Sequence, residues 1–248
     1  MSFGRHLILD SCVVLTDVFR SQKFGAAVEK MKRDSTKAKI PLLITVSVFE
    51  ECETRVNGLM ILLAKIVDEL WDYMIEVHKD QPSESRPMSQ ADIQEIGNFF
   101  EDAKRRYHDN VTTRDQVAAY EVLIVDFLEE KLTSRESLSQ KEFFNNCMVQ
   151  VQRLQHTLDG QLLTYSSNRL TYPIDNSSVQ ALHFKLPKIK PSDLRILLEA
   201  NEHKKTHPKT IFISLDDHDI ILEAKRIESE IGLRCATPVY AVNTVTQI

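Results

Sequence analysis

Four short acidic segments, far apart in the sequence, each lie at the end of an apolar run that is typical of a strand. They are residues 7–10, 43–51, 192–194 and 211–219. Carboxylates at the carboxyl ends of parallel strands converge on one crevice of an open α/β sheet. Two carboxylates 4 Å apart repel each other by about 4 kcal/mol at an effective dielectric constant near 20. A cation relieves this repulsion, so the pattern predicts a divalent-metal site.

The order of the expected elements predicts a parallel sheet. In chain order these elements are a strand at 6–10, a helix over about 17–33, a strand at 41–46, a helix from near Val48, a helix from Asp193, a strand at 211–214, a helix over 218–230 and a strand at 235–242. Strand–helix–strand units of this kind place their strands parallel in one sheet. We therefore expect a three-layer α/β/α fold with a central parallel sheet of four or five strands.

The middle of the chain is expected to be a helical insertion. Apolar residues recur at helical spacing through most of residues 81–163, and segments that resemble capping boxes begin at Ser89, Thr113 and Ser139. We place the core of the fold at about 1–80 and 185–248. Between the insertion and the second part of the core, residues 164–190 show little periodicity and are expected to be an irregular linker.

Composition excludes several classes of protein. The chain has 248 residues, of which 42% are hydrophobic, and its longest apolar stretch, residues 59–64, is far too short for a membrane span. The first residues show no secretory signal pattern. The four cysteines have no CxxC spacing, so we expect reduced thiols in a cytoplasmic protein, without a structural zinc site or a membrane partner.

The charge is unevenly distributed along the chain. The formal net charge is −5, but residues 20–39 hold seven basic residues and two acids, and residues 66–102 hold ten acids and two basic residues. The basic segment is either a solvated face or a track for phosphates. Candidate phosphate contacts are Lys23, Lys188 and Lys190. The histidines at 203 and 207, which lie among lysines, are expected on a solvated helix end.

The four acidic segments together resemble the motifs of the PIN-domain nucleases. Residues 10–15 resemble that family's opening strand-plus-Asp motif, and residues 44–52 resemble its second motif, with Glu51 in the acidic position. Asp193, followed seven residues later by Ala200, matches the third motif, and residues 213–219 resemble the fourth. The resemblance covers roughly 1–54 and 190–248, and it implies a PIN-like fold.

Two departures from the family pattern affect the site. The fourth motif often has a second Asp two residues after the first, where this chain has His218, so the acids that would bind a metal are either Asp216 or, shifted by one residue, Asp217 and Asp219. The 142 residues from Glu51 to Asp193 also exceed the two or three helices that the resemblance implies.

The resemblance and the carboxylate chemistry imply roles for these residues. Mg²⁺ and Mn²⁺ prefer carboxylate oxygens and also bind substrate phosphates. The predicted catalytic residues are Asp10, Glu51, Asp193 and Asp216, and the predicted metal ligands are Asp10, Asp193, Asp216 and Asp219. Predicted auxiliary residues are Glu50, Asp217, Ser11 and Ser214. The alternative for each carboxylate is a helix N-cap or a polar strand end, where Asp is favoured in any case.

Three functional hypotheses follow. The first is a Mg²⁺- or Mn²⁺-dependent ribonuclease that acts on single-stranded or structured RNA; the choice of RNA over DNA comes only from the resemblance. The second is a catalytically silent PIN-like module that binds RNA or protein. In the third, the helical insertion forms a homodimer interface or docks a protein regulator, because its acidic segment fits a protein partner better than RNA.

Overall fold

A computed structural model describes residues 5–20, 24–79, 85–107, 111–134, 136–216 and 219–245. The chain divides into two compact units. One unit contains the sheet and comprises Met1–Thr54 and Asp159–Ile248, and the other is helical and comprises Arg55–Leu158. The predicted metal-site residues all belong to the first unit.

The first unit is built on a five-stranded parallel sheet, which confirms the α/β prediction. Its strands lie in the order β3-β2-β1-β4-β5. Their bounds are β1 His6–Leu9, β2 Leu42–Thr45, β3 Arg169–Leu170, β4 Thr210–Ile213 and β5 Arg234–Ala236. Every pair is parallel, and the longest register joins β1 to β4 from His6↔Thr210 to Leu9↔Ile213. The central strand β1 and its neighbour β4 are mostly apolar and almost entirely buried, as strands covered on both faces must be.

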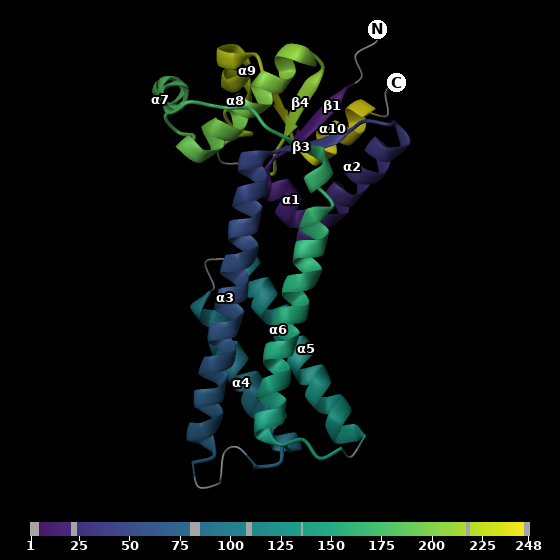
Figure 1. Cartoon of the computed structure of the whole chain (residues 1–248), viewed down its shortest axis with the longest axis vertical. Coiled ribbons are helices and arrows are strands. Elements are labelled where there is room, and N and C mark those ends of the chain that lie inside the picture. The colour runs from purple at the N-terminus through teal and green to yellow at the C-terminus, as the bar shows by residue number, and fades with distance from the viewer. Residues whose placement is uncertain are drawn as a thin grey trace. The chain divides into compact units, whose positions relative to one another are not determined.

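The strand order reverses between β1 and β4. The chain adds β2 and β3 on one side of β1, and then β4 and β5 on the other side. Right-handed crossovers in opposite directions place helices on opposite faces of the sheet. Figure 1 shows the strands between α1 and α2 on one side and α8 and α9 on the other. Ligands of open α/β sheets bind at such a reversal, outside the carboxyl ends of the strands.

The helices of this unit form the two layers that cover the faces of the sheet. They are α1 Ser11–Val18, α2 Gly25–Lys37, the first turns of α3 Val46–Val77, the end of α6 Gln140–Leu163, α7 Asn176–Lys185, α8 Pro191–Thr206, α9 Ala224–Ile231 and α10 Pro238–Val245, with a 3₁₀ turn at Ser166–Asn168. The expected start of a helix near Val48 and the expected helix from Asp193 therefore agree with α3 and α8 to within two residues.

Three expected elements are wrong in their extent. The helix expected over 17–33 is two helices, because α1 ends at Val18 and Arg20 adopts a left-handed φ of 50° before α2 starts at Gly25. The helix expected from 218 starts only at Ala224, after turns at 219–223. The last strand ends at Ala236, because Pro238 lacks the N–H that a central ladder needs and instead starts α10.

The segment 164–190 is structured rather than irregular. It contains β3 at the sheet edge and the ten-residue helix α7. Asp175 caps α7, since its side chain accepts a 2.7 Å hydrogen bond from the N–H of Ser178. Helix α7 packs on α8. This packing supplies the stability that ten residues of weak periodicity would not have alone.

The helical unit extends beyond the expected insertion. It begins at Arg55 because α3 continues without a break to Val77, and α4 Gln90–Arg106, α5 Val111–Thr133 and most of α6 complete it. Its core includes an edge-to-face pair of Trp71 and Phe144, with ring centroids 4.8 Å apart. Of the helices in the described ranges, none combines the length and apolarity that crossing a bilayer requires.

Candidate metal centre

Asp10 joins the two strands at the reversal point. It follows β1 directly and is 5% exposed. Its Oδ2 accepts a 2.6 Å hydrogen bond from the hydroxyl of Ser214, the residue after β4, and its Oδ1 accepts a 2.8 Å bond from the N–H of Ser11. Burial raises the pKa of Asp10, these hydrogen bonds oppose the rise, and the charge of Glu51 adds to it. A buried carboxyl group therefore lies at the crevice that the topology creates.

Three further carboxylates gather in one group. Asp193 in the first turn of α8, Asp216 after β4 and Asp219 each offer an oxygen, and these three oxygens lie within 4.8 Å of one another. The loop after β4 is folded back on itself, since the N–H of Asp219 donates to Oδ1 of Asp216 at 3.1 Å. Ser214 also fixes this loop, because its hydroxyl accepts a 2.9 Å bond from the N–H of Asp216. Asp10 is not a member of this three-oxygen group.

Electrostatics connect this group to Asp10 and Glu51. Burial, and next the negative charge of Asp10, raise the pKa of Asp193 to about 6, and the charge of Glu51 contributes in the same direction. The Ser192 hydroxyl and the charge of Lys190 oppose the rise. A carboxylate whose charge raises the pKa of another lies within electrostatic range of it. The sheet thus brings together acids that the sequence separates by more than 180 residues.

The other predicted residues have different surroundings. Lys190 precedes α8 and its charge acts on Asp193, whereas Lys188 forms a 3.2 Å ion pair with Glu223. Ser11 is buried and contacts Asp10 through its backbone N–H. Glu50 is exposed, is not a member of the three-oxygen group, and lines the groove described below. Lys23 and Asp217 lie outside the described residues.

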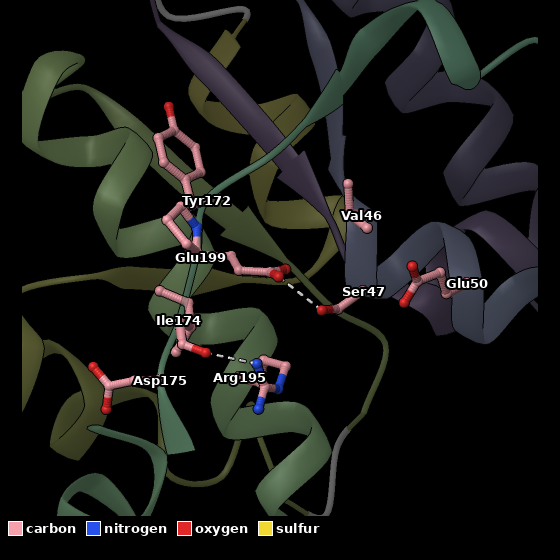
Figure 2. A pocket seen from close by; sticks show the side chains of 9 residues that line it. Val46, Ser47, Glu50, Tyr172, Ile174, Asp175, Arg195 and Glu199 are labelled. Atoms are coloured by element: carbon pink, nitrogen blue, oxygen red, sulfur yellow. Dashed lines mark hydrogen bonds between the residues drawn. The ribbon is translucent and has the colours of Figure 1, made fainter. Parts of the chain in front are cut away.

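A groove of about 580 Å³ lies beside the helices that carry Glu51 and Asp193. Figure 2 shows Ser47 and Glu50 from α3 on one side of it and Glu199 and Arg195 from α8 on the other. The Ser47 hydroxyl donates a 2.7 Å bond to Oε1 of Glu199, whose side chain is buried. Arg195 donates to the carbonyl of Ile174 at 2.8 Å, which holds the loop before α7 against α8. The groove thus has polar groups on both sides, and hydrogen bonds hold Ser47, Glu199 and Arg195 in place.

Sequence reasoning missed one participant in the site, Cys12. Its Sγ lies 3.1 Å from Oδ2 of Asp10 and accepts a 3.1 Å bond from the N–H of Leu215. Burial, followed by the charge of Asp10, raises the pKa of this thiol well above its usual value. The thiol therefore stays protonated and can donate to Asp10. Its position two residues after a strand-end Asp was the only signal available.

The donor set suits a hard divalent cation. Carboxylate oxygens on neighbouring chain segments are the ligands that Mg²⁺ and Mn²⁺ prefer, and both ions keep several waters when the protein supplies few ligands. A cation also offsets the negative charge of Asp10 and Glu51, which adds to the effect of burial in raising the pKa of Asp193. The geometry of the three-oxygen group is therefore compatible with one such ion.

Comparisons of the chain with protein-family models, with curated proteins and with solved structures found no significant match.

Proposed function

We propose that this protein is a divalent-metal-dependent phosphodiester hydrolase, a ribonuclease of the PIN type that uses Mg²⁺ or Mn²⁺. The observation that carries the proposal is the grouping of Asp193, Asp216 and Asp219 beside the buried Asp10. This group lies at the strand-order reversal, where open α/β sheets bind their ligands. The PIN-like form of the three-layer fold, and RNA as substrate, rest on the motif resemblance.

The proposed roles divide between binding and positioning. Asp193, Asp216 and Asp219 would hold the cation, and Asp10 would either bind it directly or keep the ends of β1 and β4 together through Ser214. Glu51 would orient the attacking water, and Lys190 would contact substrate phosphate. A cation held there would neutralise phosphate oxygens and lower the pKa of an attacking water. This chemistry needs no serine or cysteine nucleophile.

Cleavage of an end-labelled RNA of mixed sequence, with Mg²⁺ or Mn²⁺ and with EDTA, tests the proposal. We expect metal-dependent cleavage that Asp216→Asn lowers at least about 100-fold, the size of effect seen when one group that stabilises developing charge is lost. The substitution keeps the shape of the side chain and an oxygen for the N–H of Asp219. Asp10→Asn should also abolish cleavage without unfolding the protein.

The matched control is Glu29→Gln, which removes one negative charge from an exposed position on α2 in the same unit. It should leave the cleavage rate unchanged. Cleavage that persists in EDTA, or that survives Asp216→Asn at the wild-type rate, would contradict the proposal. A labelled single-stranded DNA of the same sequence, assayed alongside, decides between RNA and DNA.

A second function is favoured by the surroundings of Asp10. Its two oxygens already receive bonds from Ser11 and Ser214, with Cys12 in contact, which is also what a purely structural strand-end residue would have. We infer a catalytically silent module as the alternative, with RNA or a protein as its partner. Such a module would bind labelled RNA or a partner without cleaving RNA at any metal concentration.

Light scattering tests the third role, a dimer formed through the helical unit.

A further inference from the structure

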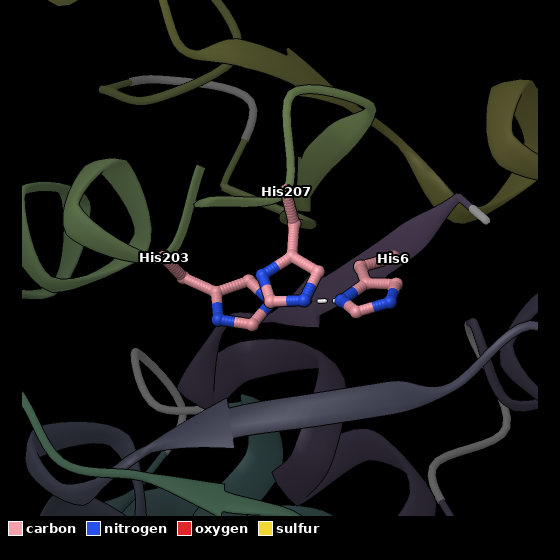
Figure 3. A group of neighbouring side chains, drawn as sticks. All are labelled: His6, His203 and His207. Carbon is pink, nitrogen blue, oxygen red and sulfur yellow. Dashed lines mark hydrogen bonds between the residues drawn. The ribbon is translucent and has the colours of Figure 1, made fainter. Parts of the chain in front are cut away.

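Three histidines from distant parts of the chain meet at the amino end of the sheet. His6 starts β1, His203 lies in the last turn of α8, and His207 follows that helix immediately. One ring nitrogen from each lies within 4.8 Å of the others (Figure 3). His6 Nδ1 and His203 Nε2 are 2.8 Å apart, and the rings of His6 and His207 and of His203 and His207 stack with centroids 4.3 Å apart.

We propose that His6, His203 and His207 form a second metal site, one that takes a borderline transition-metal ion such as Zn²⁺. Imidazole nitrogen is a preferred ligand of Zn²⁺, whereas Mg²⁺ and Mn²⁺ prefer oxygen. Zn–N bonds of about 2.0–2.1 Å in a tetrahedron place neighbouring nitrogens about 3.3 Å apart. The three observed nitrogens lie within 4.8 Å of one another, and the nearest pair is 2.8 Å apart. Because the rings stack, binding one ion requires them to rotate until the three nitrogens point at a common centre.

The surroundings of the three rings support a metal site. Zinc-bound histidines usually engage their other ring nitrogen with a polar partner that fixes the tautomer. The hydroxyl of Tyr172 lies 2.9 Å from Nδ1 of His203, and the hydroxyl of Thr206 lies 2.9 Å from Nδ1 of His207. With Nδ1–H of His203 donating to Tyr172, Nε2 of His203 accepts the 2.8 Å hydrogen bond from Nδ1–H of His6, and a bound metal would displace that proton.

The backbone also holds the histidines in place. His203 is 4% exposed, and the N–H of His207 donates to the carbonyl of His203 at 3.1 Å. The carbonyl of His207 in turn accepts from the hydroxyl of Thr210 at 2.7 Å, which fixes the connection from α8 into β4. A metal bound there would tie β1 to α8 at the edge of the sheet opposite the acidic group. Three protein ligands leave a fourth position for water or a small anion.

A Zn²⁺ titration of the full chain against a chromophoric chelator tests the site, with excess Mg²⁺ present to occupy the acidic group. We expect one Zn²⁺ per chain to compete with the chelator, and we expect this competition to be lost in His207→Gln. Tyr172→Phe should weaken Zn²⁺ binding by about 10-fold, the lower end of the effect of losing a partner of a ligand. Co²⁺ in place of Zn²⁺ should give the intense visible absorption of a tetrahedral nitrogen site.

Two controls separate this site from the acidic one. His156→Gln changes an exposed histidine of the helical unit and should bind Zn²⁺ like the wild type. Asp216→Asn should leave Zn²⁺ binding intact, whatever it does to cleavage. A wild-type protein that fails to compete with the chelator would overturn the inference without any variant. So would a His207→Gln variant, folded by circular dichroism, that binds Zn²⁺ as tightly as the wild type.

Discussion

The hydroxyl of Ser214 donates a 2.6 Å hydrogen bond to Oδ2 of Asp10, across a sequence separation of 204 residues. This bond joins the carboxyl ends of β1 and β4, the two strands between which the strand order reverses. Ser214 is fully buried, and its hydroxyl oxygen also accepts a hydrogen bond from the N–H of Asp216. One side chain therefore couples the buried acid to the loop that carries the candidate metal ligands.

Ser214→Ala should destabilise the sheet unit. The substitution leaves a buried carboxyl group without its strongest neutral donor, and a hydrogen bond to a charged group contributes about 1.5–3 kcal/mol. We expect the free energy of unfolding in urea to fall by about that amount. Ser167→Ala, at an exposed position of the same unit, should change it by less than about 0.5 kcal/mol. Equal effects of the two substitutions would contradict the role of Ser214.

Asp193→Asn should stabilise the metal-free protein in a pH-dependent way. Burial and the charge of Asp10 raise the pKa of Asp193 from 3.8 to about 6. Between these values the folded protein binds more protons at Asp193 than the unfolded chain does, so ionisation lowers the free energy of unfolding as pH rises. Asp193→Asn cannot ionise and so does not lose stability in this way. The difference in the free energy of unfolding between the variant and the wild type should grow from about pH 4 to about pH 6 and then stay constant.

Urea unfolding of both proteins in EDTA, at several pH values across this range, measures that difference. Adding Mg²⁺ above pH 7 should reverse its sign, because only the wild type retains the full ligand set. A difference that does not change with pH would show that Asp193 has no raised pKa. Asp34→Asn, on α2, supplies the matched control for loss of an Asp in the same unit.

The helical unit has its own buried ion pair. We expect this pair to contribute to the stability of the fold and not to RNA cleavage. Arg86 donates to both oxygens of Asp92, at 3.1 and 2.6 Å, and both side chains are buried. Burial raises the pKa of Asp92, but hydrogen bonds from Arg86 and Ser89 outweigh it and hold this pKa below its usual value. Arg86→Met removes the guanidinium and leaves His78, whose Nε2 lies 2.9 Å from Oδ1 of Asp92, and Ser89 as the remaining partners of this buried carboxylate. The loss should cost up to about 3–5 kcal/mol.

Thermal and urea unfolding of Arg86→Met measure this cost, with Arg153→Met, at an exposed site, as the control. The double variant Arg86→Met, Asp92→Leu should recover most of the lost stability, since an apolar pair can replace a buried ion pair. A neutral effect of Arg86→Met would show that water or the neighbouring His78 replaces the guanidinium of Arg86 at Asp92. RNA cleavage by Arg86→Met should match the wild type at temperatures where the variant is folded.

The parallel sheet was predictable because its strands are short, apolar and followed by acids or helices. Leu7–Leu9 and Ile211–Ile213 carry that signal in their own residues. The break between α1 and α2 could not be predicted from the sequence. It depends on the left-handed conformation of Arg20, and an arginine does not indicate that conformation. Helix α7 was missed for a related reason: Asp175 and Asn176 favour turns and helix starts equally.

The acids of the candidate site were predictable as a set, but their geometry was not. Strand ends placed Asp10 and Asp216 at one edge of the sheet, whereas the fold of the loop after β4 decides that Asp219 joins Asp216. The histidines were expected on a solvated helix end, yet His203 is buried against His6. The spacing of His203 and His207 placed them near each other, but nothing near His6 in the sequence indicated that it would join them.

Calorimetric titration of Mn²⁺ into the wild type, Asp216→Asn and Glu29→Gln at neutral pH tests the central claim most directly. The wild type and Glu29→Gln should bind Mn²⁺ at one saturable site, and Asp216→Asn should bind it at least about tenfold more weakly, a difference of about 1.4 kcal/mol. Repeating the titration near pH 6 should show proton release from Asp193, whose pKa is about 6. Equal Mn²⁺ affinity in the wild type and Asp216→Asn, or no binding in either, would contradict a metal centre at the end of β4.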